Sequence, residues 1–204
     1  MNKKILYLAS SSPSRKKLLE DAKIPFTVIT QTADESHCEW ALPLDVLVTK
    51  IAHYKMEHVV LPEGKANGEI CFVVTSDTLS QDNNGIIQKK PIDRADAKRK
   101  IESARNGASL CTAFCLEKNV WHNGRWHMTD RIDKVVSANY NFIIPDNLIE
   151  YYLDNSIGLK TAGAIAVEDF GLQFLENVNG SYSAIIGLPL FELRVALTEL
   201  GFFE

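Results

Sequence analysis

The chain has 204 residues, 46% of them hydrophobic and 24% charged, a balance typical of one globular domain or two small lobes. Its 26 acidic and 22 basic residues give a net charge of −4, which argues against a protein that binds nucleic acid mainly by neutralising phosphates. Residues 5–9, ILYLA, are too short for the apolar part of a signal peptide, and no run approaches the ~18 apolar residues of a membrane span. We therefore expect no nucleic-acid partner, no membrane and a cytoplasmic location.

Strand and helix patterns alternate from the start of the chain. KKILYLA, residues 3–9, predicts a buried strand, and the serine and proline at 12–13 predict the N-cap and first residue of a helix. FTVIT, residues 26–30, predicts a second strand. Apolar residues at helical spacing predict a helix within residues 43–60. The apolar run CFVVTS, residues 71–76, predicts a short interior strand that ends at the following aspartate.

The second half of the chain adds tight turns to this alternation. Asn123 and Gly124 favour a hairpin between two strands within residues 109–128, and NNGI at 83–86 marks another turn. We expect the remaining elements to be a polar helix at 93–105, a strand at 135–144, a helix from Pro145 to Leu153 and a last helix at 188–200. The pattern predicts an α/β fold with some antiparallel strands.

The four cysteines show no metal-binding spacing. Cys111 and Cys115 lie in a strand-like segment, where four residues span about 13 Å, too far for both thiols to bind one ion. The five histidines form no metal-spaced pair either. We therefore expect buried thiols and no zinc site.

A group of hydroxyls and cations stands where the first helix is predicted to begin. The free N–H groups and partial positive charge of a helix start favour an anion, and the hydroxyls of Ser10, Ser11 and Ser12 add donors. Arg15 lies three and four residues before a leucine pair, so it shares their face and is expected to lean inward. These features predict an anion site; the alternative is a capped helix with a solvated basic face.

A second polar group follows the strand at 71–76. Ser76, Asp77 and Thr78 would lie at the carboxyl end of that strand, where ligands bind in open α/β sheets. If the two strands are parallel neighbours, a carboxylate meets the anion site. A carboxylate and a phosphate repel each other unless a metal lies between them, so Mg²⁺ is implied. The alternative is that Asp77 only begins a turn.

Taken together, these blocks resemble the Maf family of nucleoside triphosphate pyrophosphatases, also called septum-formation-inhibitor-like proteins. The family opening LAS-x-SPRR-x-x-LL appears as LASSSPSRKKLL, its SDT motif as residues 76–78, and its GKP motif as KKP at 89–91. A late block with an Ala-Gly pair and a GLP segment covers residues 162–189. The blocks keep the family order, so we expect one Maf-like domain over residues 1–204.

The resemblance implies an elongated mixed β-sheet with flanking helices, in two lobes around a central cleft, as in Maf and inosine triphosphatase-like proteins. It also implies a homodimer that cleaves a nucleoside triphosphate to the monophosphate and pyrophosphate with Mg²⁺ or Mn²⁺. Asp77 matches the catalytic aspartate, and Glu35 stands where the family has an acidic partner for the metal or water. The candidate substrate- and phosphate-binding residues are Ser10, Ser12, Arg15, Lys55, Thr78, Lys90 and Glu168.

The chain departs from the family pattern at several positions. Ser14 replaces the first arginine of the opening, and Lys89 replaces the glycine of GKP. Residues 162–176 are similar to the branch associated with methylated guanosine triphosphate, whereas SDT and GSYS are similar to the dTTP and UTP branch. These departures leave a second reading open, a catalytically weak nucleotide-binding regulator of cell division.

Overall fold

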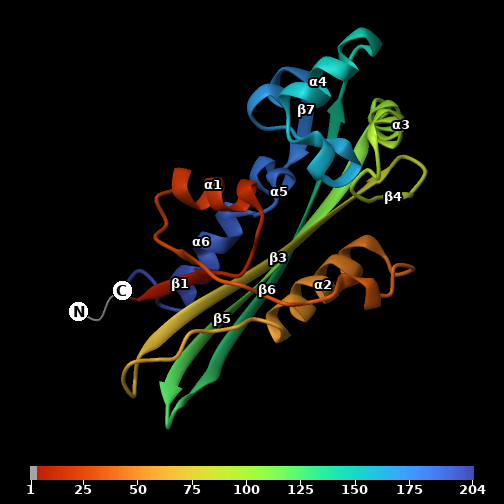
Figure 1. Ribbon diagram of the computed structural model, residues 1–204. Coiled ribbons are helices and arrows are strands. Elements are labelled where there is room, and N and C mark those ends of the chain that lie inside the picture. The colour runs from red at the N-terminus through yellow and green to blue at the C-terminus, as the bar shows by residue number, and fades with distance from the viewer. Residues whose placement is uncertain (1–3) are drawn as a thin grey trace.

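The computed structural model describes residues 4–204 and has a twisted, mixed β-sheet at its centre (Figure 1). The sheet has seven strands in the order β2-β1-β3-β5-β6-β7, with β4 paired to β3. The strands are β1 (Ile5–Leu8), β2 (Thr27–Val28), β3 (Ile70–Asp82), β4 (Ile87–Gln88), β5 (Ala108–His122), β6 (Arg125–Phe142) and β7 (Leu175–Gly180). Strands β1, β2 and β3 are parallel neighbours, and the pairs β3–β4, β3–β5, β5–β6 and β6–β7 are antiparallel.

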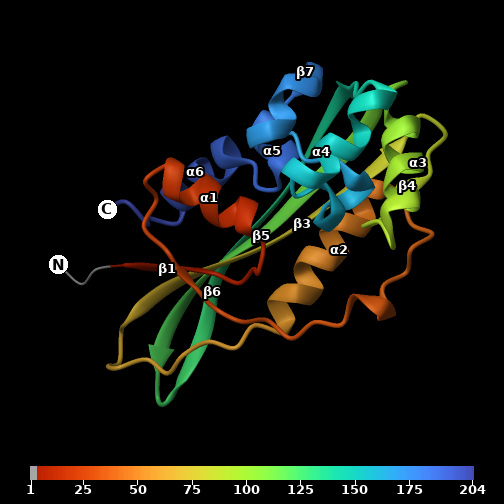
Figure 2. The ribbon, with the colours of Figure 1, turned by 45° about the horizontal axis from the view of Figure 1, so that its top comes forward.

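Helices flank both faces of this sheet (Figures 1 and 2). The α-helices are α1 (Pro13–Asp21), α2 (Leu44–Glu57), α3 (Arg94–Ala104), α4 (Ile149–Asn155), α5 (Tyr182–Ile186) and α6 (Leu190–Glu199). Short 3-10 helices are η1 (Glu35–His37), η2 (Asp146–Leu148), η3 (Gly158–Lys160), η4 (Ala162–Ala164) and η5 (Asp169–Phe174). Helices α1 and α6 lie on one face of the long strands, α2 on the other, and α3, α4 and β7 gather at one end.

The alternation of side chains along β3 assigns each residue to one of these faces. Phe72 and Val74 pack with residues of α1 and α6, whereas Cys71 and Val73 pack with Met56 of α2. A separate apolar cluster joins α3, α4 and the ends of β5 and β6. The sheet is therefore buried on both sides along its middle, as near-continuous apolar strands require.

Several local predictions are confirmed. Ser12 is the N-cap of α1, its hydroxyl accepts from the Arg15 amide at 3.4 Å, and a proline opens the helix. Asn123 and Gly124 form the turn between β5 and β6 with φ values of 52° and 76°. Two positive φ values in succession are what a tight two-residue hairpin turn requires, and an Asn-Gly pair tolerates them. Helices α2 and α3 also lie within or close to their predicted ranges.

The predicted end of the interior strand at Asp77 is wrong. Strand β3 continues to Asp82, and β5 pairs with every residue from Ile70 to Asp82. The hydrogen bonds between the strands join backbone groups, so they continue through the polar residues at which the strand was predicted to end. The polar side chains form hydrogen bonds with other residues. The hydroxyl of Thr75, for example, donates to the carbonyl oxygen of Ala52 at 2.7 Å.

Other boundaries also differ from the predictions. The separate strand predicted at 135–144 is the second half of β6, which pairs with β5 along nearly its whole length. The strand predicted at 26–30 shortens to β2, and the last helix begins at Leu190, after Pro189 as its N-cap. Strand β7, which pairs with the end of β6, was not predicted.

The cysteines are placed largely as expected. All four cysteines are free thiols; Cys71, Cys111 and Cys115 are buried and Cys38 is half-buried. Phe202 is buried against Phe72, with the ring centroids 5.2 Å apart. Across residues 4–204, no helix combines the length and the apolar character needed to cross a membrane.

Candidate active site

Several of the candidate residues lie at a gap in one edge of β3. Strand β1 pairs with β3 only as far as Val74, and β4 pairs with it again only from Ser80. In the described part of the chain, no strand pairs with residues 75–79 on this side. The edge of the sheet is therefore open here. Asp77, on the α2 face, and Thr78, on the α1 face, both lie at this opening.

Arg15 is fixed on the α1 side of the gap by three separate segments. Its Nε donates to the carbonyl oxygen of Gly187 at 2.7 Å, and Nη1 and Nη2 donate to the hydroxyls of Ser10 and Thr78, both at 3.2 Å. Burial lowers the pKa of Arg15, while the charges of Asp77 and Glu35 oppose that shift. The arginine leans inward as predicted, and two of the five N–H groups of a guanidinium remain for a ligand.

Lys55 joins two carboxylates on the α2 side of the gap. Its Nζ lies 2.6 Å from Asp77 Oδ1 and 2.8 Å from Glu35 Oε1. Asp77 and Lys55 are each only 9% exposed along the side chain, whereas Glu35, in η1, is 43% exposed. The sequence analysis proposed Lys55 as a phosphate-binding cation; the structure places it between the two acids.

The Asp77 carboxylate is strongly desolvated. Burial raises its pKa, and this effect outweighs the opposing charges of Lys55 and Arg15. Its second oxygen, Oδ2, is buried and has no hydrogen-bond partner within residues 4–204. An unpartnered buried oxygen is costly, so a cation or a donor from a ligand would satisfy it.

Ser76, which the sequence analysis grouped with Asp77, is joined here by two residues that were not predicted, Thr112 and Gly187. Ser76 Oγ lies 2.8 Å from the Ala113 carbonyl oxygen and 3.1 Å from that of Gly187, and Thr112 Oγ1 lies 2.9 Å from Thr78 Oγ1. Gly187 has a φ of 128°, a conformation that favours glycine, and a Cβ there would lie 3.4 Å from Arg15 Nε. The signal for Gly187 was the GLP segment, whereas Thr112 could be found only from its pairing with Thr78.

Of the two remaining candidate residues, Glu168 is held by a hydrogen bond and Lys90 is not. Glu168 Oε1 accepts from the Ser14 hydroxyl at 2.7 Å, which brings the late block of the chain to the first turn of α1. The neighbouring Asp169 pairs with Lys17 at 2.9 Å on the surface. Lys90 is exposed, and no hydrogen bond or ion pair to another described residue holds it. The structure thus joins Glu168 to the Ser14 end of α1 and leaves Lys90 free at the surface.

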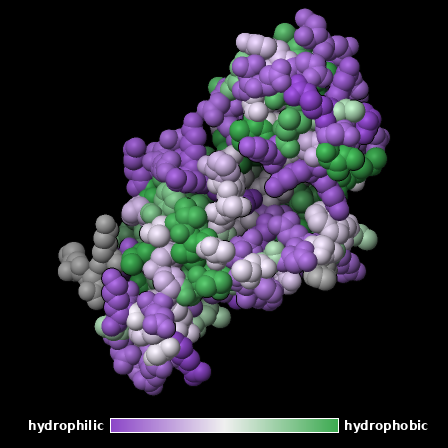
Figure 3. Space-filling model, viewed as in Figure 1, coloured by the Kyte–Doolittle hydropathy of each residue, from purple (hydrophilic) through white to green (hydrophobic). Residues whose placement is uncertain are grey.

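The surface is hollowed near the centre of one face, between the part that holds α3, α4 and β7 and the rest of the molecule (Figure 3). A cavity of about 720 Å³ elsewhere is lined mainly by β1, by residues 25–30 and by residues 60–62. None of the candidate residues lines that cavity, so its volume does not decide where a substrate binds.

A family model described as "Maf-like protein" matches residues 5–200. The chain belongs to the Maf-like protein family. It is 30% identical over 204 residues to the dTTP/UTP pyrophosphatase of Hydrogenovibrio crunogenus, covering 99% of both chains. It is 33% identical to the nucleoside triphosphate pyrophosphatase of Chlamydia pneumoniae and 34% identical to that of Trichormus variabilis. These matches cover 96% of this chain and 94% and 93% of the two relatives.

The structure gives a local reason for both departures from the Maf-like opening and GKP motifs. Ser14, in place of an arginine, is the donor that holds Glu168. Lys89, in place of a glycine, lies over the Trp40 ring with its Nζ 3.7 Å from the centroid, a cation–π contact. In this Maf-like protein the two residues that depart from the motifs, Ser14 and Lys89, therefore make specific contacts with other segments.

Proposed function

We propose that this protein hydrolyses a nucleoside triphosphate to the nucleoside monophosphate and pyrophosphate. The observation that carries the proposal is the meeting of Arg15, Lys55, Asp77 and Glu35 at the gap in the β3 edge. Cations that offset phosphate charge stand beside carboxylates that can bind a metal and activate water. The names of the relatives, dTTP/UTP and nucleoside triphosphate pyrophosphatase, support the same reaction.

The carboxylates fit a divalent metal, so we include Mg²⁺ or Mn²⁺ in the proposal. Asp77 Oδ2 is a buried oxygen without a partner among the described residues, and hard cations such as Mg²⁺ prefer carboxylate oxygen. Asp77 and Glu35 would hold the ion. When bound, it would polarise phosphate oxygens and offset the negative charge of the triphosphate.

Asp77 is the proposed general base. Its burial raises its pKa, and a carboxylate whose pKa moves toward neutrality accepts a proton from water more readily. Lys55 holds Asp77 and Glu35 beside one another through its two short ion pairs. Activity should fall as pH is lowered through the raised pKa of Asp77, because the protonated acid cannot act as a base.

Arg15 is the proposed cation for the phosphate chain. Three hydrogen bonds fix its position before any ligand arrives, so little reorganisation accompanies binding. Ser10, Ser12 and Thr78 place hydroxyls around it, and Lys90 would swing in from the surface to meet the leaving pyrophosphate. Glu168, held by Ser14, would lie on the nucleoside side of the cleft.

Phosphorus NMR tests the reaction directly. The protein is incubated with Mg²⁺ or Mn²⁺ and, in separate runs, dTTP, UTP and 7-methyl-GTP, without added pyrophosphatase. Pyrophosphate and monophosphate should appear together as the first products. Orthophosphate as the first product would contradict the proposal, and tight binding without turnover on any nucleotide would favour the regulator instead.

We also propose a cytoplasmic homodimer, as the family resemblance implies. Phe203 is 52% exposed at the end of the chain, beside the buried Phe202, and a partner subunit could cover it. Light scattering should give twice the chain mass of 22.8 kDa. A monomer at micromolar concentration would exclude the dimer.

A further inference from the structure

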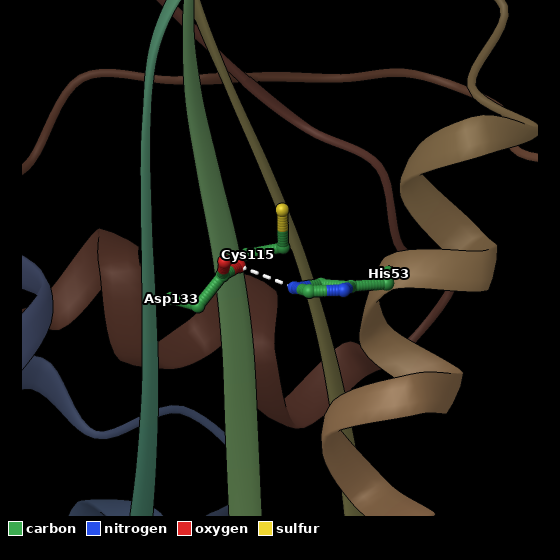
Figure 4. A group of neighbouring side chains, drawn as sticks. All are labelled: His53, Cys115 and Asp133. Atoms are coloured by element: carbon green, nitrogen blue, oxygen red, sulfur yellow. Dashed lines mark ion pairs between the residues drawn. The ribbon is translucent and has the colours of Figure 1, made fainter.

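Three metal-ligating side chains meet on the α2 face of the sheet (Figure 4). His53 comes from α2, Cys115 from β5 and Asp133 from β6, and the last two are directly paired across the strands. One ligand atom from each lies within 4.8 Å of the other two. The His53 Nε2 to Asp133 Oδ1 distance is 2.7 Å.

The His53 nitrogen is shielded from solvent but lacks a hydrogen bond. Nε2 is buried and has no hydrogen-bond partner within the described residues, although it makes an ion-pair contact with Asp133 Oδ1. A buried ring nitrogen without a hydrogen bond is costly. It is a donor atom available to an ion.

We propose that His53, Cys115 and Asp133 bind a divalent transition metal of the zinc class. Nitrogen, sulfur and oxygen donors together suit Zn²⁺ and Co²⁺, whereas Mg²⁺ prefers oxygen alone. Around a tetrahedral zinc, ligand atoms lie about 3.3 to 3.8 Å apart, as follows from bond lengths of about 2.0 to 2.3 Å. On binding the ion, the distance between His53 Nε2 and Asp133 Oδ1 would increase by less than about 1 Å, and the Cys115 sulfur would move toward the ion.

The arrangement favours a metal site over a catalytic Cys-His-Asp triad. In a triad the histidine uses its two ring nitrogens for different partners, one toward the nucleophile and one toward the acid. Here Cys115 and Asp133 occupy neighbouring positions on paired strands and approach the ring together (Figure 4). The side chains of His53 and Asp133 are 35% and 33% exposed, which leaves a route for the ion and room for water as a fourth ligand.

Metal binding at this site would release a proton. A cysteine thiol is ordinarily protonated at neutral pH, whereas it binds a metal as the thiolate. On binding, the S–H bond breaks, a sulfur–metal bond forms and the proton passes to the buffer. The bound ion would tie α2 to the β5–β6 pair, two residues along the helix from Lys55.

Cobalt titration of the chelator-treated full-length protein tests the proposal. One equivalent of Co²⁺ should produce a thiolate-to-cobalt charge-transfer band and release about one proton in weakly buffered solution. Zn²⁺ should abolish the band, and excess Mg²⁺ should not. Absence of a saturable band would overturn the site.

Single variants assign the ligands. Cys115→Ser should abolish the charge-transfer band, and His53→Gln and Asp133→Asn should each weaken Co²⁺ binding at least about a hundredfold, since loss of even an outer-shell partner costs 10- to 100-fold. Cys111→Ser is the matched control, a buried thiol on the same strand, and should leave binding unchanged.

Two further results separate the new site from the active site. Cys38→Ser should keep the band, because Cys38 lines a cavity with His53 but is not one of the three grouped ligands. If Cys115→Ser fails to fold, the partly exposed His53 and Asp133 variants still decide the question. A band that survives in the Cys115→Ser, His53→Gln and Asp133→Asn proteins would refute the assignment.

Discussion

Replacing Asp77 by asparagine should abolish most turnover while the protein stays folded. Asp77 is 9% exposed along its side chain and lies 2.6 Å from Lys55, so its charge acts in a poorly solvated position. Loss of a positioned general base lowers rates by about 10²- to 10⁴-fold, or about 2.7 to 5.4 kcal/mol of transition-state stabilisation. Glu35→Gln should cost less, about tenfold, because Glu35 is 43% exposed and solvent screens its charge.

The assay is steady-state release of pyrophosphate with saturating metal, on protein whose fold is verified by circular dichroism. Glu117→Gln is the matched control, since Glu117 is also a buried acid paired with a cation, Arg131, but lies outside the site. It should lower stability and leave kcat unchanged. Wild-type turnover in folded Asp77→Asn protein, or a larger loss for Glu35→Gln, would refute the assignment of the base.

Further predictions concern charge, pH and packing. Lys90→Ala should lower turnover about tenfold, because Lys90 is exposed and no described residue holds it in place. This is less than the loss of about a hundredfold that is typical of a preorganised donor. The control Lys16→Ala should leave turnover unchanged, and equal rates for both variants would exclude a role for Lys90. The raised pKa of Asp77 means that the folded state takes up a proton at higher pH than the unfolded state, so its stability falls as pH rises through that pKa. Urea unfolding should therefore show wild type gaining stability over Asp77→Asn as pH drops from 7 toward about 4, and a constant difference would contradict this. Gly171→Ala should destabilise the fold by about 3 kcal/mol in the same assay, because a Cβ there would lie 1.7 Å from the Ala166 carbonyl oxygen; unchanged stability would show that the backbone shifts freely.

Local sequence signals determined much of the first helix and the long hairpin. A serine, a proline and a leucine pair define the start and inner face of α1, because capping and helical spacing act within a few residues. The Asn123-Gly124 turn likewise depends on backbone preferences of two adjacent residues. The inward lean of Arg15 followed from the same local spacing and is confirmed by its three hydrogen bonds.

The length of the strands depended on their partners. Nothing in the residues around Asp77 distinguishes a strand that ends there from one that continues, since polar side chains are compatible with both. The antiparallel partner β5 extends the ladder to Asp82, and the early end of β1 leaves the edge open. The residues around Asp77 were expected to meet others at the end of β3, whereas they lie along its middle, where the pairing with β1 has ended.

The sequence by itself determined the chemistry available to this protein: hydroxyls and a cation at a helix start, an aspartate after an apolar run, and a set of motifs in Maf-like order. Only the tertiary structure decided which groups touch. Lys55 lies between Asp77 and Glu35. His53 lies beside Cys115 and Asp133, which are 62 and 80 positions further along the chain. Spacing rules describe neighbours on one element, whereas these contacts join separate elements through the packing of α2 against the sheet, and that packing is a property of the whole core.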